Sequence, residues 1–213
     1  MSSAVTQAED IPIRHFYHVH TSPEWPRIAG EHLSALRQAQ FTWPVTVGIV
    51  GHWAARAPAR DWFTKHGVTD FTEADRGWED VTLRSLWKWA QHNPTGIVLY
   101  AHVKGSYTVT AGNDDWRQAM TLRLVGGWQF CLEHLEGVDA LGCHWLTPDE
   151  YARRDVATPF FAGNFWWARC SYIAGLPEPV PADSRYDHER WIGLGNPQVY
   201  DLLPGWPRYG QEP

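Results

Sequence analysis

The chain has 213 residues, enough for one large domain with a sizeable hydrophobic core. Apolar residues make up 44% of it and charged residues 20%, which excludes a disordered or fibrous protein. The formal net charge of -6 argues against bulk nucleic-acid binding through a basic face and leaves room only for a local basic patch.

The cysteines and the N-terminal segment bear on the compartment. Cys131, Cys143 and Cys170 are widely spaced, with neither metal-ligand spacing nor a disulfide framework, so we expect a reducing cytoplasm. Residues 1–10 are polar and lack the charged-then-apolar pattern of a secretory signal. No run approaches the ~18 apolar residues that a membrane span requires. The 14 tryptophans can fill a core and can also stack on sugars or bases.

Strand and helix patterns alternate along the first part of the chain. Residues 14–20 alternate weakly and predict a first strand, and Pro26 suits the first turn of a helix that runs to about Gln38. The β-branched, apolar residues 45–50 predict a central strand. Residues 54–75 follow neither period clearly.

Two further helices and a strand follow. Residues 81–91 carry an apolar stripe at helical spacing, and residues 97–100 form an apolar run typical of a buried strand. A long helix is predicted from residue 115 to about residue 136, with Asn113 or Asp114 as its cap.

The last part of the chain completes the pattern. Residues 140–146 predict another strand, and the aromatic stretch within residues 160–176 predicts a hairpin or an antiparallel edge strand. Strands that alternate with helices indicate an α/β fold with a mainly parallel sheet flanked by helices. We expect a flexible N-terminal segment over residues 1–12, a single compact domain over residues 13–196, and an irregular tail over residues 197–213.

Polar side chains lie at the ends of the predicted strands. His18 and His20 end the first strand, His52 follows the second, and His102 and Lys104 follow the buried run of residues 97–100. Open α/β sheets bind ligands at the carboxyl ends of their strands. A lysine there suggests an anionic ligand, most simply a phosphate. The alternative is a strand that leaves the core into solvated residues.

Six short motifs follow one another between residues 15 and 196. They are Glu79–Leu83 (acidic-x-Thr-Leu), Leu86–Ala90 (Leu-Trp-x-x-Ala), Leu99–Gly105 (Leu-Tyr-x-His-x-Lys-Gly), Asp115–Arg117 (Asp-Trp-Arg), Gly163–Ala168 (Gly-Asn-Phe-Trp-Trp-Ala) and Glu189–Gly193 (acidic-x-Trp-Ile-Gly). Their order resembles a family of bacterial and viral proteins assigned as glycosyltransferases. The resemblance implies a GT-A-like, Rossmann-like domain that moves a sugar from a nucleotide-diphosphate donor to a hydroxyl acceptor.

The chain departs from the usual GT-A pattern at one strand end. Many such enzymes place Asp-x-Asp there to hold a divalent ion against the sugar diphosphate, whereas this chain has His102 and Lys104. Lys104 can supply the positive charge that the leaving diphosphate needs. We therefore assign the donor diphosphate to His18, His102, Lys104, Gly105 and Arg117.

A metal remains the alternative to this lysine. Mn or Mg would then be held by Asp114 and Asp115, with His102 as a further candidate. Because acidic residues at a helix start are expected for capping alone, we favour that interpretation for the two aspartates. His18 and His20 share one face of a strand, but no pattern of zinc ligands supports a zinc site.

The segment that begins at Gly163 is the second candidate site. Gly163 permits close approach of the backbone to a ligand, and the Asn164 amide can both donate to and accept from sugar hydroxyls. Trp166 or Trp167 could stack on a sugar. Neighbouring residues of a strand point to opposite faces, so at most one of the two tryptophans is expected to meet the ligand.

A transferase also needs a base for the acceptor hydroxyl. Glu189 is our preferred candidate and Asp187 the second, although both could be surface charges paired with nearby arginines. Glu79 and Thr82 fit a helix N-terminus, and we favour that interpretation over a ligand contact. Two other functions stay open: a non-catalytic carbohydrate- or nucleotide-binding protein, and a viral-type transferase that acts on modified DNA bases.

Overall fold

The computed structural model describes residues 11–148, 158–182 and 184–205. They form an α/β fold around a seven-stranded sheet of order β3-β2-β1-β4-β8-β5-β9. Among these strands β8 is antiparallel to both of its neighbours, and the other pairings are parallel. The strands are β1 (Ile13–His20), β2 (Val45–Val50), β3 (Asp70–Ala74), β4 (Ile97–His102), β5 (Ala140–Gly142), β8 (Trp166–Arg169) and β9 (Val199–Asp201). The strands β6 (Trp145–Leu146) and β7 (Phe160–Phe161) pair separately, as an antiparallel pair.

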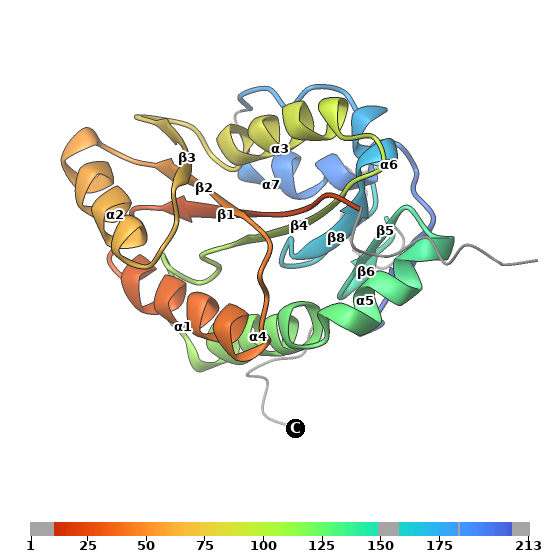
Figure 1. Ribbon diagram of the computed structural model, residues 1–213, viewed down its shortest axis with the longest axis horizontal. Helices are drawn as coiled ribbons and strands as arrows, with labels where there is room; N and C mark the ends of the chain where they lie inside the picture. Colours follow the sequence, from red (N-terminus) through yellow and green to blue (C-terminus); the bar gives the residue numbers. More distant parts are fainter. Residues whose placement is uncertain (1–10, 149–157, 183, 206–213) are drawn as a thin grey trace, which may run out of the picture.

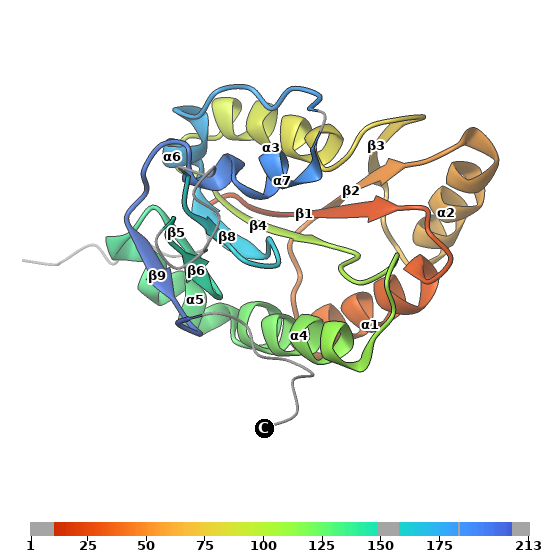
Figure 2. The ribbon, with the colours of Figure 1, turned by 180° about the vertical axis from the view of Figure 1, so that it is seen from behind.

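Helices cover both faces of the sheet (Figures 1 and 2). On one face lie α1 (Trp25–Gln38), α4 (Ala111–Thr121) and α5 (Trp128–His134), and on the other lie α3 (Asp80–His92), α6 (Cys170–Ala174) and α7 (Arg185–Glu189). The helix α2 (Trp53–Lys65) flanks β2 at the β3 end of the sheet. Short helical turns complete the set: η2 (Leu122–Gly126), η3 (Leu135–Gly137) and η4 (Trp191–Gly193). None of the helices in the described residues is both long and apolar enough to cross a membrane.

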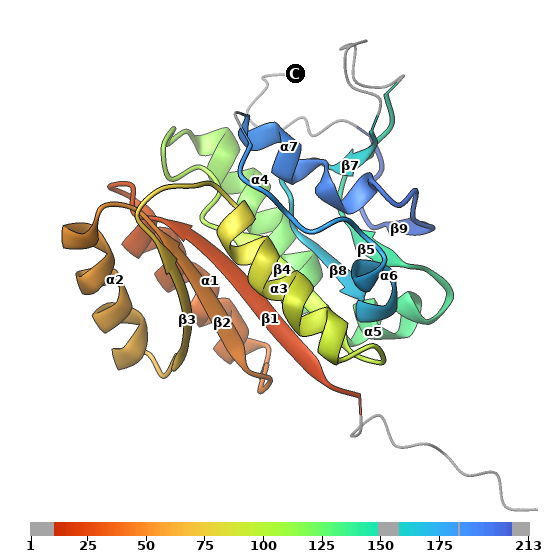
Figure 3. The ribbon, with the colours of Figure 1, turned by 90° about the horizontal axis from the view of Figure 1, so that it is seen from above.

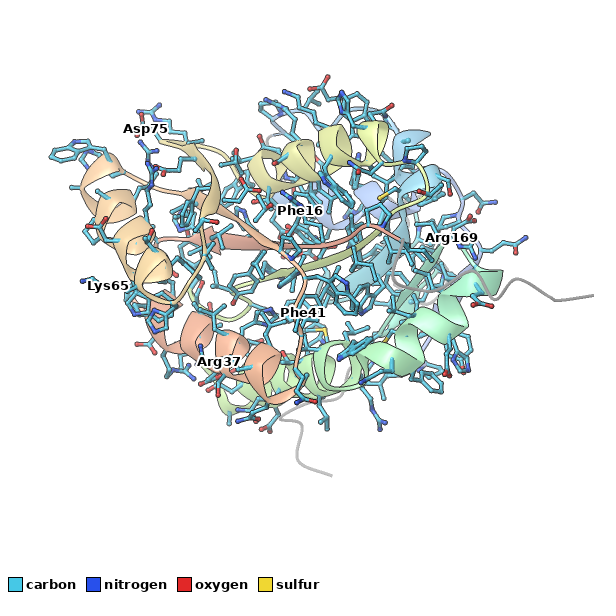
Figure 4. The ribbon with its side chains drawn as sticks, viewed as in Figure 1. Phe16, Arg37, Phe41, Lys65, Asp75 and Arg169 are labelled. Carbon is cyan, nitrogen blue, oxygen red and sulfur yellow. The ribbon has the colours of Figure 1, made fainter. Side chains whose placement is uncertain are left out.

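The alternation of side chains along β1 builds two cores. Tyr17 and Val19 pack into the cluster on the α1 side, and Phe16 packs into the cluster on the α3 side. Figure 4 shows the same division, with Phe16 towards α3 and Phe41 on the side of α1. Both faces of the sheet are therefore closed by apolar packing, which leaves the ends of the strands for a ligand.

Five predicted elements are confirmed. The bounds of β1, α1, β2, α3 and β4 lie within two residues of those expected. Residues 54–75, which followed neither period, contain most of α2 and all of β3. The antiparallel strand expected near residues 160–176 is β8, but it lies inside the sheet between β4 and β5 and not at an edge. The helices on both faces supply the cover that an inner strand needs.

The long helix predicted to start at Asp115 is broken in two. Its cap is Thr110, whose Oγ1 accepts a hydrogen bond from the backbone N–H of Asn113 at 3.1 Å, so neither Asn113 nor Asp114 is the cap. The π-helical turn η2 ends α4, and Gly127 precedes α5. Glycine disfavours the helix interior, which fits a break at this position.

Two predictions for the C-terminal part are wrong. Residues 140–146 are not one strand, because His144 adopts a positive φ of 59° and separates β5 from β6. Residues 197–213 were expected to be irregular, yet residues 199–201 form β9, which pairs in parallel with β5. The short β9 takes its hydrogen bonds from β5, so no local period announces it. Of the N-terminal segment 1–12, residues 1–10 lie outside the described residues.

The order of the strands places a possible ligand site. The chain runs from β1 to β2 and β3 on one side, and β4 then pairs with the other side of β1. The direction of winding therefore reverses between β1 and β4. At such a switch point the carboxyl ends of two parallel strands open a crevice in which α/β proteins bind ligands. Figure 3 shows β1 and β4 side by side beneath α3.

Candidate functional site

A cleft of about 320 Å³ lies at the carboxyl ends of β1 and β4. Its lining comes from four separate segments of the chain: His18 and His20; Trp78 and Glu79; His102, Val103, Lys104, Gly105, Ser106, Tyr107, Thr108 and Asn113; and Glu189. The structure thus brings together His18, His102, Lys104, Gly105 and Glu189, which the sequence had placed in one site.

Lys104 is held at the cleft by its surroundings. Its ammonium lies 3.6 Å from the centroid of the Trp116 ring, in a cation–π contact. Its carbonyl oxygen accepts a hydrogen bond from Nη1 of Arg117 at 3.2 Å. Gly105 turns the chain with a φ of +85°, and a Cβ there would lie 3.2 Å from Cβ of Asn113. The charge of Lys104 therefore has a defined position.

The two imidazoles beside it are fixed by hydrogen bonds. Nδ1 of His18 is hydrogen-bonded to Oγ1 of Thr82 at 2.8 Å, and Nε2 of His102 donates to the carbonyl oxygen of Gly163 at 2.9 Å. Burial, together with the nearby His102, lowers the pKa of His18 well below its usual value. His18 is therefore neutral at pH 7.

Glu79 lines the cleft, although the sequence favoured a purely structural role for it. It occupies the N-cap position of α3, as expected, but its side chain makes no capping hydrogen bond within the described residues. Instead, Oε2 accepts hydrogen bonds from the Tyr100 hydroxyl at 2.6 Å and from Nδ2 of Asn164 at 2.5 Å. Glu79 is only 7% exposed, and this burial raises the pKa of its carboxyl group. In the sequence, only the place of Glu79 three residues before Thr82, in the segment Glu79–Leu83, indicated that it could lie near a ligand.

The segment from Gly163 supports the cleft from behind. Asn164 is 1% exposed, with a φ of 53°, and its Oδ1 accepts a hydrogen bond from Nε1 of Trp166 at 2.7 Å. Gly163 has a φ of 91°, and a Cβ there would lie 2.7 Å from Sδ of Met120. The Asn164 amide is thus used to hold Glu79 and Trp166.

The two tryptophans assigned to sugar binding are core residues. Trp166 stacks on Tyr100 on the α3 side, and Trp167 donates through Nε1 to the carbonyl oxygen of Leu124 on the other side. Both side chains are fully buried. They do point to opposite faces, as expected, but helices cover both faces and neither ring lines the cleft.

Exposed aromatic residues lie at the rim of the cleft instead. Trp78 is 38% exposed and Tyr107 is 57% exposed, and both line the cleft. The Tyr107 hydroxyl lies 2.7 Å from the ring nitrogens of His20. Such side chains offer faces for stacking on a base or a sugar.

The two candidate bases separate in the structure. Glu189, at the end of α7, is half-buried and lines the cleft. Asp187 is exposed, is paired with Arg190 at 3.6 Å, and is absent from the described lining of the cleft. Asp187 therefore faces solvent, on the same short helix from which Glu189 lines the cleft.

Arg117 and Asp114 form hydrogen bonds that connect α4 to neighbouring parts of the fold. Arg117 is buried and donates to Glu31 and to Asp114, each at 2.7 Å, so it reaches the cleft only through the Lys104 carbonyl. Burial disfavours ionisation of Asp114, but hydrogen bonds from Arg117 and Arg27 outweigh it and lower the pKa of Asp114. Direct contact of Arg117 with the diphosphate is not supported.

No group of three or more His, Cys, Asp or Glu side chains that could hold a metal occurs among the described residues. The charge of Asp114 is already balanced by two arginines, and Asp115 is exposed on α4. The geometry around these two aspartates therefore does not support a metal site.

Comparison with known proteins gives the family but no activity. A family model described as a domain of unknown function (DUF8361) matches residues 16–193, so the chain belongs to that family. No curated protein matches the chain. Among solved structures, 4-diphosphocytidyl-2C-methyl-D-erythritol synthase from Anaerococcus prevotii is similar with a TM-score of 0.46 and 9% identity, over 92% of this chain and 88% of that one.

Proposed function

We propose that this chain transfers a sugar from a nucleotide-diphosphate donor to a hydroxyl acceptor, with the donor bound in the cleft between β1 and β4. The observation that carries the proposal is that one lysine, Lys104, and two glutamates, Glu79 and Glu189, line the same cleft. A leaving diphosphate requires a fixed positive charge, and an acceptor hydroxyl requires a base. The motif resemblance supports the same reaction.

Lys104 is the centre of the donor site in this proposal. Trp116 and Arg117 fix the ammonium and the backbone before any ligand arrives, so little rearrangement is needed when negative charge develops on the leaving oxygen. The neutral His18 flanks the phosphates without adding a fixed charge, and the ring of His102 lies beside them. Trp78 and Tyr107 stack on the base or the sugar at the rim.

Donor binding is tested by titration calorimetry of the protein with UDP-, GDP- and TDP-sugars, in the presence of either manganese or EDTA. We expect at least one donor to bind. The two metal conditions separate the lysine mechanism from one that uses Mn or Mg. If no donor binds under either condition, the donor-site proposal is wrong.

The variant Lys104→Ala tests the role of the ammonium. We expect it to weaken diphosphate binding about tenfold or more, because a charge-assisted contact contributes about 1.5–3 kcal/mol. Lys65→Ala is the matched control, since Lys65 is exposed at the end of α2, away from the cleft (Figure 4). Equal affinity of both variants and the parent protein would show that Lys104 does not bind the donor.

A reducing compartment suits this enzyme. Cys131, Cys143 and Cys170 are all buried free thiols. We therefore propose that the reaction takes place in the cytoplasm.

A further inference from the structure

The two oxygens of the Glu79 carboxylate have different environments. Oε2 accepts from Tyr100 and from Asn164, which fixes the orientation of the whole group. Oε1 lies 3.8 Å from Nδ1 of His102, too far for a hydrogen bond, and accepts none from the described residues. Since Glu79 lines the cleft, Oε1 is the oxygen available to a bound molecule.

Glu79 and the two groups that hold it come from three parts of the fold. Tyr100 lies on β4, Asn164 precedes β8, and Glu79 itself is the first residue before α3. Both donors are buried, and Nε1 of Trp166 in turn holds the Asn164 amide. An oriented carboxylate with a raised pKa suits a general base, which works best when its pKa approaches the operating pH.

We propose that Glu79 is the catalytic base and that Oε1 receives the proton of the acceptor hydroxyl. This inference rests on the proposed function, because it needs the donor sugar in the same cleft. It requires an acceptor group that donates a hydrogen bond to Oε1, as the hydroxyl of the proposed function does.

The reaction step balances as a single displacement. The O–H bond of the acceptor breaks, and its proton passes to Oε1 of Glu79. The oxygen uses its electron pair to form a bond with the anomeric carbon. The bond from that carbon to the diphosphate oxygen breaks, and its electron pair stays on the leaving oxygen, where the Lys104 ammonium neutralises the charge.

Glu189 is the competing carboxylate of the cleft. It ends the five-residue helix α7 and is half-buried, whereas Glu79 is buried. A base must be kept within reach of the proton it removes, and the two hydrogen bonds to Oε2 hold the Glu79 carboxylate in place at the cleft.

The test compares the kcat of the variants Glu79→Gln and Glu189→Gln, with the donor sugar that calorimetry identifies as substrate. The probe reactions are release of the nucleoside diphosphate with water as acceptor and transfer to methyl glycosides. We expect Glu79→Gln to lose about 10²–10⁴-fold in kcat while it still binds the free nucleoside diphosphate, and Glu189→Gln to lose less than tenfold. The opposite ranking would identify Glu189 as the base and overturn the inference, while the proposed function would stand.

The variant Tyr100→Phe provides a second test, the pH dependence of kcat. A purely structural role of Glu79 would not change this pH dependence. The Tyr100 hydrogen bond lowers the pKa of Glu79, so its loss raises that pKa. Because the rate rises with pH as Glu79 loses its proton, the acidic limb of the kcat profile should move to higher pH. An unmoved limb would overturn the inference even if Glu79→Gln failed to fold. No transfer by the parent protein would overturn the proposed function, and the inference with it.

Discussion

At the scale of single residues, Glu79 shows how a site is built at a cost to the fold. A carboxylate that is only 7% exposed has lost most of its contact with water, and its hydrogen bonds from Tyr100 and Asn164 only partly compensate. The pKa therefore stays raised. A group of this kind is tolerated where it performs a task, and it is seldom the most stable choice for its position.

A stability measurement follows from this raised pKa. The folded state binds the Glu79 proton more tightly than the unfolded state, so the contribution of Glu79 to stability falls as the pH rises from the unfolded pKa through the folded one. Glu79→Gln removes this charge and keeps an oxygen for both donors. We expect its melting temperature at pH 8 to exceed that of the parent protein by about 2–4 °C, as for a gain of about 1 kcal/mol.

The difference between the two proteins should shrink as the pH approaches the unfolded pKa of glutamate, about 4.3. Thermal unfolding followed by circular dichroism across this pH range measures it. A gap of the same size at every pH would show that the effect comes from packing and not from the charge.

Residues that act through distant partners were the hardest to predict. Asn164 was identified as a candidate from its amide, but its partner Glu79 lies 85 residues away in the sequence. The tryptophans next to it were assigned correctly to opposite faces by the period of a strand. That both faces would be covered by helices depends on the whole sheet and cannot be deduced from a six-residue motif.

At the scale of elements, α3 connects the sheet to the cleft. Its Thr82 holds His18, and β2 leaves room for Thr82 through Gly48. A Cβ at Gly48 would lie 1.8 Å from Oγ1 and 2.8 Å from Cβ of Thr82, both on a helix that packs against β2. The glycine therefore sets the distance of α3 from the sheet, and with it the position of His18.

The variant Gly48→Ala should push α3 away from β2. We expect it to lower the free energy of unfolding by about 1–3 kcal/mol, as for other overpacked sites, and to weaken donor binding through His18. Urea unfolding and calorimetry measure the two effects. Gly137→Ala is the control, because a Cβ at Gly137 would meet no atom within 4 Å. Equal stability of the two variants would contradict this role of Gly48.

The elements that were predicted well have strong local patterns. The apolar runs of β2 and β4 and the helical stripe of α3 contain the information for their own structure. The long helix from residue 115 carries a stripe too, but its π-helical turn depends on how η2 packs against α1, and the sequence period gave no sign of it.

At the scale of the whole molecule, the last described strand, β9, completes the sheet. β9 lies at its edge beside β5, and the Asp201 carboxylate accepts hydrogen bonds from the backbone N–H groups of His144 and Trp145, both at 2.8 Å. It also accepts one from Leu203 at 3.0 Å. Asp201 lies outside the expected domain of residues 13–196, yet it holds the turn between β5 and β6 in place.

Asp201→Ala should remove these three bonds together. We expect a loss of about 1–3 kcal/mol in the free energy of unfolding, because the partly buried N–H groups of Trp145 and Leu203 would lose their acceptor, whereas that of His144 keeps the carbonyl oxygen of Leu203. Asp201→Asn is the matched control, since its amide oxygen keeps part of the set and should cost less. Urea unfolding of both variants tests the point, and a neutral Asp201→Ala would show that β9 is only loosely attached.

The walls of the cleft have a consequence for the chain as a whole. They come from β1, from the segment before α3, from the chain after β4 and from α7, which meet only once the sheet has assembled. No fragment of the sequence carries the pocket by itself. Any ligand that occupies it must therefore stabilise the folded chain relative to the unfolded one by mass action. Contacts that stabilise the assembled sheet in turn maintain the fraction of the chain that can bind the ligand.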